Sequence, residues 1–465
     1  MSQSLFEARV PIHPRSVSGR FRNLKTGILL LAYGVFFLLP WLRWERETGP
    51  SQAVLFDIPH RQFYLFDLVV FPQDIFWLAG LLMIAALLLF FVTGLAGRVF
   101  CGYFCFQTLW TDVYMFLERR IQGERPARLR LAKQPWNAEK ILKLGATHAA
   151  WLLVAFATGL GFVLYWGDAP SLVVAFFSGE APNAAYITAG LLTLTTYTFA
   201  GLAREQVCTY MCPYARFQAV MFDRDTLIVS YDRERGEGSA GRAKPSRDLK
   251  TREQRQQAGV GDCIDCGYCV QVCPTGIDIR DGLQIQCIHC ALCIDACDQI
   301  MDKQGWPRGL IRYTSESALE GKKTRFLKLK TVGYGAAILV VTALLALSIA
   351  NRPDLDASVS QVRQPLFVQM ADGSTQNSYE IALNNKTQHQ LDLEIDVVGL
   401  EGATLDLGRV EEIVLDPSQR STVLARVRYD AGPDAPPRLP IGFEIRDREG
   451  LMDPLRIDSQ LSLRP

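Results

Sequence analysis

Apolar residues fall into separate blocks along the 465-residue chain. Five blocks are long enough to predict membrane-spanning helices, the first of them only with Trp41 and Trp44 extending it into the interface. They cover residues 27–42, 75–95, 144–166, 184–203 and 332–350. A further apolar run at 172–177 is too short to cross a bilayer, so we expect an interfacial or loop segment there. The pattern therefore predicts an α-helical transmembrane bundle of about five spans.

The pattern changes beyond Pro353, where apolar and polar residues alternate as they do along half-buried strands. The alternating apolar positions are Tyr379, Ile381, Leu383, Leu391, Leu393, Ile395, Val397, Val423, Ala425, Val427 and Tyr429. Turn signals such as Asp372-Gly373 and Asn384-Asn385 separate these segments. Short strands at this spacing predict an all-β, immunoglobulin-like sandwich. It carries no chemical motif, so we interpret it as a binding or packing module.

The distribution of charge predicts how the chain is oriented in a membrane. The formal net charge is only +1, so the total charge indicates no partner class, and we expect no nucleic acid. Lys and Arg are concentrated in the N-terminal tail, in residues 98–143 and after the fourth predicted span, whereas the two intervening loops are acidic. The positive-inside rule therefore predicts a cytoplasmic N-terminus and a C-terminal domain on the opposite, periplasmic side.

All 12 cysteines lie between residues 101 and 297, and eight of them form two tandem C-x2-C-x2-C-x3-C runs. The runs consist of Cys263, Cys266, Cys269 and Cys273, and of Cys287, Cys290, Cys293 and Cys297. This is the spacing of bacterial two-cluster ferredoxins, in which the fourth cysteine of each run binds the other cluster. We expect two [4Fe–4S] clusters, one held by Cys263, Cys266, Cys269 and Cys297, the other by Cys287, Cys290, Cys293 and Cys273.

A pair of all-cysteine zinc sites is the alternative, but two complete runs in tandem favour the clusters. Eight thiolates around redox centres indicate electron transfer rather than acid–base chemistry, and they suit the cytoplasm. Pro274 follows the first run as expected, whereas Asp298 stands where a second proline would be.

The predicted organisation is a tail 1–26, a transmembrane domain 27–231, a charged, flexible linker 232–258, a ferredoxin domain 259–306, a basic joint 307–331, a fifth span 332–350 and a sandwich 351–465.

The other four cysteines form an internal repeat. Cys101 and Cys105 follow the second predicted span as C-x-Y-x-C, and Cys208 and Cys212 follow the fourth in the same pattern. If each motif is helical, its two cysteines lie on one face, and two equivalent hairpins would bring four thiols together beside the ferredoxin domain. Soft thiolates select Cu(I), zinc or an iron–sulfur cluster. Packing of small cysteine side chains at helix contacts is the alternative.

Four further residues are candidates near these sites. Met211 and Tyr103 lie within the two membrane motifs, so we expect both near the thiols, Met211 as a possible metal ligand. His148 lies in the first turns of the third predicted span. It is a candidate metal ligand or proton relay, and an ordinary core histidine is the alternative. His289 sits inside the second cysteine run, where hydrogen bonding that tunes a cluster is favoured over ligation.

The order of these features resembles the FixG/CcoG (RdxA) family of bacterial cytochrome oxidase accessory proteins. The resemblance rests on GRVFCGYFCFQTLWTD at 97–112, EQVCTYMCPYARFQAVMFD at 205–223, the tandem runs, GLIRY at 309–313 and the C-terminal sandwich. It covers essentially the whole chain. The family has C-x3-C-P in both membrane motifs, whereas here Phe106 replaces the first proline and both thiols remain.

The resemblance implies a multi-pass protein of the bacterial inner membrane that reduces Cu(II) to Cu(I) for assembly of a cbb-type cytochrome c oxidase. Copper would be the substrate or bound ion, and Cys101, Cys105, Cys208 and Cys212 would be the catalytic thiols. The implied partners are membrane lipid, oxidase subunits or copper chaperones, an unknown cytoplasmic electron donor and a second copy of the chain. A more distant resemblance to polyferredoxins of nitrate and nitrous-oxide respiration implies electron transfer from quinol.

Three functions remain open at this point. The first is a cupric reductase, and the second is a quinol-linked electron relay with His148 as a proton partner. A quinone pocket needs buried polar residues in the spans, and the sequence offers few, which favours the first. The third is a non-enzymatic scaffold for oxidase assembly. For the site alone, the four membrane thiols could instead hold a further iron–sulfur cluster.

Overall fold

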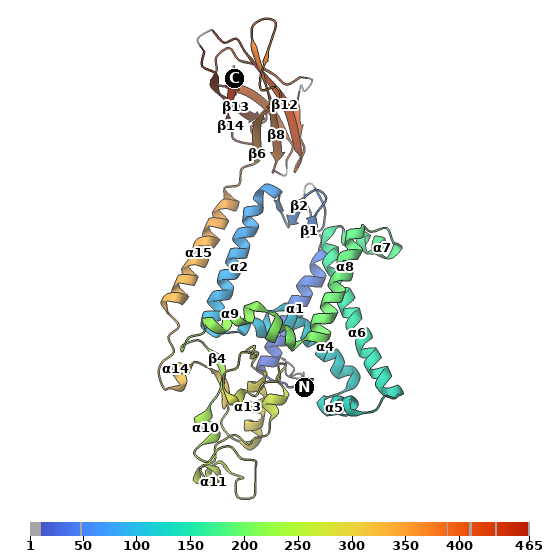
Figure 1. The fold of residues 1–465 in the computed structure, drawn as a ribbon, viewed down its shortest axis with the longest axis vertical. Coiled ribbons are helices and arrows are strands. Elements are labelled where there is room, and N and C mark those ends of the chain that lie inside the picture. The colour runs from blue at the N-terminus through green and yellow to red at the C-terminus, as the bar shows by residue number, and fades with distance from the viewer. Residues whose placement is uncertain (1–10, 47–48, 388, 409–411, 433–434, 464–465) are drawn as a thin grey trace, which may run out of the picture. The chain divides into compact units, whose positions relative to one another are not determined.

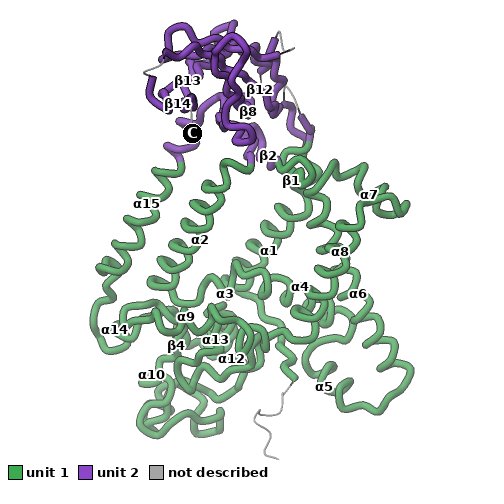
Figure 2. The backbone as a smooth tube through the Cα atoms, turned by 45° about the horizontal axis from the view of Figure 1, so that its top comes forward, with its two compact units in different colours: residues 1–42, 52–61, 72–345 green, residues 43–51, 62–71, 346–465 purple. Residues whose placement is uncertain are grey.

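The structure is a computed structural model that describes residues 11–46, 49–387, 389–408, 412–432, 435–463. The chain divides into two compact units, coloured separately in Figure 2. The first unit consists of residues 1–42, 52–61 and 72–345, and the second of residues 43–51, 62–71 and 346–465. The cysteine-rich segment and the membrane helices belong to the first unit, except for the end of the last helix from residue 346, and the sandwich belongs to the second.

Among the described residues, four helical segments are long and apolar enough to cross a membrane. They are Arg20–Trp41, Pro72–Ala96, Ala138–Trp166 and Leu329–Ala350. Their helices are α1 (Arg20–Leu38) with the 3-10 turn η1 (Leu39–Trp41), α2 (Ile75–Ala96) after η2 (Pro72–Asp74), α6 (Ala138–Val163) with η3 (Leu164–Trp166), and α15 (Leu329–Ala350). Figure 1 shows these helices as extended coils. They match four of the five predicted spans, so this is a membrane protein with a helical transmembrane domain.

The remaining predicted span, 184–203, is divided between two kinds of helix. α8 (Asn183–Thr196) has 14 residues and continues directly into seven residues of π-helix, η4 (Tyr197–Ala203). α8 packs closely on α6 at Gly159. A Cβ added there would lie only 2.4 Å from the Ala189 carbonyl oxygen. The short apolar run at 172–177 lies in the ten-residue helix α7 (Ala169–Ser178), as its length predicts.

The loop after the first span contains strands that the sequence pattern did not predict. β1 (Val54–Asp57) belongs to the first unit. β2 (Gln62–Leu65) and β3 (Leu68–Val70) form an antiparallel hairpin within the second unit, with Leu65 opposite Leu68. Their residues are only partly buried or exposed at several positions, so the alternation that marks a strand is weak here.

The rest of the first unit is built from short elements around the cysteines. They are α3 (Val99–Tyr103), α4 (Phe106–Gln122), α5 (Arg125–Lys133), η5 (Val207–Met211), α9 (Pro213–Met221), β4 (Ile228–Tyr231), α10 (Arg233–Glu237), α11 (Arg252–Gln257), α12 (Tyr268–Gln271), η6 (Ile279–Asp281), α13 (Leu292–Gln304), β5 (Ile311–Thr314) and α14 (Glu316–Leu319). β4 pairs antiparallel with β5, from Ile228 opposite Thr314 to Tyr231 opposite Ile311. The ferredoxin segment is thus closed at its base by a strand pair outside the predicted 259–306.

The charged segment 232–258, which the sequence predicts as a flexible linker, contains the short helices α10 and α11. α11 begins with a capping box formed by Thr251 and Gln254. Arg255 is fully buried, and its guanidinium donates to the carbonyl oxygens of Gly261 and Cys263. A buried cation needs such partners. The charged composition suggested a solvated linker, but one of its charges is a packing element of the ferredoxin segment.

The N-terminal tail also packs onto the ferredoxin segment. The backbone N–H of Arg15 donates to the Gln271 carbonyl oxygen at 2.7 Å, and the Tyr268 hydroxyl donates to the Ser16 carbonyl oxygen at 3.1 Å. α1 then begins at Arg20 with its first N–H groups bonded to the Asp295 carboxylate. Helix N-termini favour such an anion, so a residue from α13 caps the first membrane helix.

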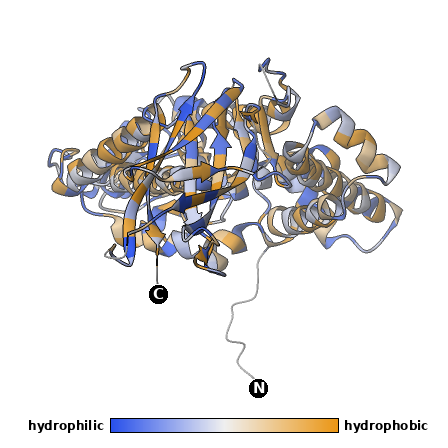
Figure 3. Ribbon diagram, turned by 90° about the horizontal axis from the view of Figure 1, so that it is seen from above, coloured by the Kyte–Doolittle hydropathy of each residue, from blue (hydrophilic) through white to orange (hydrophobic). Residues whose placement is uncertain are grey.

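The second unit confirms the predicted sandwich. One sheet has the order β10-β12-β8-β6, with β7 also on β8, and the other has β11-β9-β13-β14. The strands are β6 (Leu355–Gln361), β7 (Val368–Gln369), β8 (Thr375–Asn385), β9 (Leu391–Val398), β10 (Thr404–Asp406), β11 (Ile413–Leu415), β12 (Arg420–Tyr429), β13 (Arg438–Asp447) and β14 (Leu455–Ser462). Figure 3 shows blue and orange residues alternating along strands. Tyr379, Ile381 and Phe443 are among the fully buried side chains of its core.

Candidate metal centres

The two cysteine runs fold into loops with the same backbone shape. The residues two and four positions after the first cysteine have left-handed φ angles, which are 48° at Asp265, 65° at Gly267, 52° at His289 and 59° at Ala291. Non-glycine residues adopt this conformation at a cost, so its repetition indicates a required turn. Alternating right- and left-handed residues point successive N–H groups into a concavity that suits an anionic centre. α12 and α13 begin immediately after these turns.

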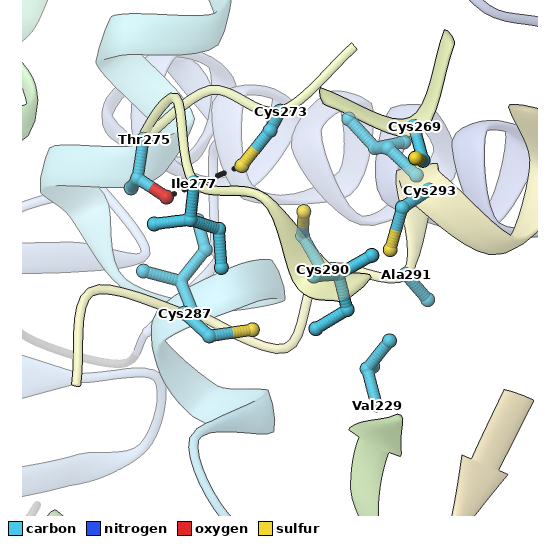
Figure 4. A pocket seen from close by; sticks show the side chains of 12 residues that line it. Val229, Cys269, Cys273, Thr275, Ile277, Cys287, Cys290, Ala291 and Cys293 are labelled. Carbon is cyan, nitrogen blue, oxygen red and sulfur yellow. Dashed lines mark hydrogen bonds between the residues drawn. The ribbon is translucent and has the colours of Figure 1, made fainter. Parts of the chain in front are cut away.

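Each loop lines its own cavity. One cavity is lined by Cys263, Cys266, Cys269 and Cys297, and we call it the first cluster cavity. The other, the second cluster cavity, is lined by Cys273, Cys287, Cys290 and Cys293, and Cys269 lines both cavities. Figure 4 shows the sulfur atoms around the second cavity. The fourth cysteine of each run therefore lies with the first three of the other run.

The donor set of these cavities fits [4Fe–4S] clusters. Among the described residues, no three or more His, Cys, Asp or Glu side chains meet closely enough to hold one metal ion. Cysteines spread over a cavity wall suit the corners of a cube better than a tetrahedral zinc ion. Burial raises the pKa of the Cys269 and Cys287 thiols to about 12, so these thiols are protonated at neutral pH until a metal binds them.

The membrane motifs are not continuous helices, so the expected single helical face is wrong. Cys101 lies in α3, but Cys105 has extended dihedral angles and is the N-cap residue that precedes α4. In the same way, Cys208 lies in the π-helical η5, and Cys212 is extended and is the N-cap residue that precedes α9. Pro213 favours an extended residue before it. The first motif breaks at the same place although Phe106 replaces proline.

Two glutamines connect the membrane motifs to each other. Cys101 Sγ donates to Gln218 Oε1 at 3.0 Å, and Gln218, on α9, is fully buried. Gln107, on α4, donates to the carbonyl oxygens of Phe199 and Arg204 at 2.8 and 3.2 Å, just before the second motif. Each motif thus holds the other through a buried amide.

The first membrane motif also packs directly on the second cysteine run. A Cβ added at Gly102 would lie 2.7 Å from the Ile288 carbonyl oxygen and 2.9 Å from Cys290 Cα. The Tyr103 hydroxyl donates to the Cys290 carbonyl oxygen at 3.1 Å. Cys101 belongs to the same buried cluster as Ile288 and Cys290. The first membrane motif therefore adjoins the second cluster cavity through Cys101, and at Gly102 there is no room for a side chain.

His289, in the second cysteine run, also contacts the segment that leads into the first membrane motif. Its Nδ1 accepts a hydrogen bond from the Arg98 backbone N–H at 3.0 Å, so the neutral ring carries its proton on Nε2. Its ring stacks on Phe222. Burial lowers the pKa of His289 to about 4, so the ring is neutral at physiological pH. Its Nε2 has no hydrogen-bond partner within the described part of the chain, and a role in tuning a cluster stays a prediction.

Met211 and His148 have different surroundings. Met211 is 56% exposed and directly precedes Cys212. His148 Nδ1 lies 2.8 Å from the Tyr197 hydroxyl, and its ring packs edge-on against Trp151. It lines a cavity of about 330 Å³ together with Glu118, Arg128 and Arg204; no cysteine is among its described lining residues. The structure thus separates His148 from the membrane thiols.

Sequence reasoning missed two buried carboxylates. Glu118 lies 3.3 Å from Arg128 and 3.0 Å from Arg204 in ion pairs, and Asp112 lies 2.8 Å from Arg22. Both carboxylates are nearly inaccessible to solvent. Their position in the sequence could have revealed them, because Asp112 and Glu118 are acidic residues within the basic segment 98–143. That segment was used only to predict the orientation in the membrane.

Comparison with known proteins gives three domain matches. Residues 203–316 match a 4Fe-4S dicluster domain, residues 78–123 match a 4Fe-4S binding domain, and residues 345–460 match the "IG-like fold at C-terminal of FixG, putative oxidoreductase". The second match contains Cys101 and Cys105. The first and third matches agree with the ferredoxin segment and the sandwich.

Curated relatives match over most of the chain. Protein RdxB of Cereibacter sphaeroides is 43% identical over 94% of this chain and 92% of its own. Protein RdxA of the same organism is 42% identical over 86% and 85%, and nitrogen fixation protein FixG of Rhizobium meliloti is 42% identical over 86% and 82%. A crystal structure of a FixG-related protein from Vibrio parahaemolyticus, 20% identical, covers 23% of this chain and 95% of its own, with a TM-score of 0.21.

Proposed function

Because this chain belongs to the FixG/RdxA family of membrane iron–sulfur electron-transfer proteins, we propose that it reduces Cu(II) to Cu(I) at its membrane thiols. The Cu(I) would serve assembly of a cbb-type cytochrome c oxidase. One observation carries this proposal, namely the packing of Cys101 and Gly102 directly on Ile288 and Cys290. It brings the soft-metal thiols against the second cluster cavity.

The residues of this chain divide the work as follows. When bound, the two clusters supply one-electron redox chemistry. Cys266 is exposed and lines the first cluster cavity, so a cytoplasmic donor has access there. Cys290 is buried and lines the second cavity beside the membrane motif. Each Cu(II) takes up one electron, and thiolate ligands stabilise the Cu(I) product because Cu(I) is soft.

The four thiols of the two motifs form one shared copper site in this proposal. Cu(I) accepts few soft ligands, so Cys101 with one thiol of the second motif is a sufficient donor set. Gln218 holds the Cys101 thiol and orients it toward the second motif. A further iron–sulfur cluster at these thiols is the alternative, and the match of residues 78–123 to a 4Fe-4S binding domain favours it.

The surroundings of the protein follow from the same proposal. The N-terminus and ferredoxin segment face the cytoplasm and the sandwich faces the periplasm of the bacterial inner membrane, because Lys and Arg are concentrated on one side of the spans. The sandwich docks an oxidase subunit or a copper chaperone. A cytoplasmic electron donor, membrane lipid and a second copy of the chain complete the proposed partners.

A quinol-linked relay is the second candidate, because the structure has the buried polar residues that the sequence alone did not reveal. The cavity of about 330 Å³ that His148 lines also contains Gln122, Thr147 and Trp151. A mixed polar and apolar lining of this size suits an amphipathic head group. Oxidation of a quinol by the purified protein, abolished by His148→Leu, would support this function over the cytoplasmic donor.

Copper titration of two double variants tests the proposal. Cys101/Cys105→Ser and Cys208/Cys212→Ser should each lose tight Cu(I) binding, and combining them should add little, because both pairs serve one site. Iron per chain should stay at the wild-type value. Met211→Leu is the control, since this exposed thioether should leave the affinity unchanged.

Two outcomes decide against the shared copper site. Wild-type copper affinity in either double variant would exclude it. Loss of about a third of the iron in both variants would assign the four thiols to a third cluster instead. A scaffold function predicts that reduced wild-type protein produces no Cu(I) at all.

A further inference from the structure

A lysine is buried where the membrane thiols meet the ferredoxin segment. Lys25, near the start of α1, has an exposed fraction of 0%, and its Nζ has no hydrogen-bond partner among the described residues. Lysine is almost never fully buried without a partner, because desolvating an ammonium is costly. From the sequence, the basic composition of the tail predicts only the orientation in the membrane.

The place of Lys25 is defined by two neighbouring cavities. It lines a small cavity, of about 20 Å³, together with Cys208 of the second membrane motif, Thr275 and Ile288. Thr275 and Ile288 also line the second cluster cavity. Two side chains therefore separate the space beside Lys25 from the cysteines of that cluster. The first cluster cavity includes neither of them.

The carboxylate that forms an ion pair with Lys25 is shared with another cation, and a second buried carboxylate, Glu205, lines the same small cavity beside Arg204. Asp112 Oδ1 lies 2.8 Å from Arg22 and 3.9 Å from Lys25. Burial favours the neutral acid, but the charges of Lys25 and Arg22 outweigh it and lower the pKa of Asp112, so the carboxylate is ionised. The group carries one net positive charge, and Arg22 makes the closer ion pair. Lys25 therefore contributes a positive charge to the small cavity, where the charges of Arg204 and Glu205 oppose each other.

We propose that Lys25 is a positioning residue for electron transfer, whose charge raises the reduction potential of the second ferredoxin centre above that of the first. Reduction adds one electron and no proton to a centre, so a nearby positive charge stabilises the reduced form. The interaction is strengthened because Lys25 is fully buried, where the low local dielectric screens its charge less than water would. The higher potential draws electrons from the exposed centre toward the membrane thiols. This inference rests on the proposal that the cysteines bind two clusters.

The test is a redox titration of both centres, monitored by electron paramagnetic resonance in the full-length protein. Lys25→Met keeps the length and removes the charge, and it should lower the potential of the second centre while leaving the first unchanged. Asp112→Asn removes a negative charge from the same group and should shift the second centre in the opposite direction. Cys266→Ser identifies the signal of the first centre, since Cys266 lines only that cavity.

Lys25→Met and Asp112→Asn together distinguish an electrostatic role of Lys25 from a structural one. A structural role for Lys25 predicts shifts of the same sign in both variants or broadening of both signals, and either result would overturn the proposal. Equal potentials in Lys25→Met and wild type, with iron per chain intact, would also overturn it. If Lys25→Met fails to assemble clusters, Asp112→Asn alone decides by the sign of its shift. Wild-type protein without two clusters would instead refute the proposed function.

Discussion

The two sets of cysteines in this chain are organised by different rules. The ferredoxin cysteines lie in short loops that repeat the same left-handed turns, and each loop completes the cavity of the other. The membrane cysteines lie on either side of helix breaks and depend on glutamines from the opposite motif. Local sequence therefore builds the first kind of site, whereas the second exists only once distant segments have packed.

The largest expected effect separates the two sets by their iron. Cys273→Ser should lose the cluster of the second cavity and about half of the iron, although its own run supplies three cysteines to the first cavity. Cys101→Ser should lose none of these two clusters' iron. Iron and sulfide per chain, with spectra of the remaining centre, measure the difference. Loss of the centre bound by Cys263, Cys266 and Cys269 in Cys273→Ser would refute the crossed assignment.

A smaller effect is expected where the two sets touch. Gly102→Val would place side-chain atoms against the backbone of Ile288 and Cys290, which cannot yield without moving the cysteine loop. Overpacking of this kind costs about 1–3 kcal/mol, and it should slow copper reduction while iron stays bound. Stability can be followed as the denaturant midpoint for loss of cluster absorbance.

Gly145→Ala is the matched control for that variant. Gly145 lies on α6 with open space around an added Cβ, so alanine should be neutral or stabilising by up to about 1 kcal/mol. If both glycine variants lost the same amount of copper reduction activity, the close contact at Gly102 would not be the reason for the loss.

The smallest effect concerns the repeated turns of the ferredoxin loops. Gly267 and Ala291 occupy the same position in the two loops with φ angles of 65° and 59°. Gly267→Ala should destabilise the first centre by about 1 kcal/mol, because an added Cβ is strained there although no atom blocks it. Ala291→Gly should change stability by less than about 1 kcal/mol, because relief of strain is offset by greater freedom of the unfolded chain. If Gly267→Ala and Ala291→Gly shifted the denaturant midpoint by the same amount in the same direction, the two loops would not be equivalent.

The sequence was sufficient wherever the information is local. The alternation of Tyr379, Ile381 and Leu383 predicted buried strand positions, and these residues are in the sandwich core. Four of the spans follow from apolar length alone. The span at 184–203 was harder, since composition does not indicate where an α-helix changes into a π-helix.

The sequence was insufficient where packing joins distant segments. Cys101 and Gln218 are 117 residues apart, and no spacing rule connects a thiol to that amide. Arg255 is buried although its immediate neighbours are both polar glutamines, and Lys25 is buried although it belongs to a basic tail. A charge run usually marks a solvated surface, and only tertiary contacts show which member of it is enclosed.

The central claim is that electrons held by the ferredoxin segment reach copper through the membrane thiols. The most direct measurement mixes anaerobically reduced protein with Cu(II) and follows cluster absorbance together with a Cu(I)-specific chelator. Wild-type protein should yield one Cu(I) for each electron that the clusters lose, and Cys101/Cys208→Ser should slow the reaction by about tenfold or more with its iron intact. Equal rates of cluster oxidation and Cu(I) formation in the variant and in wild type would contradict the account.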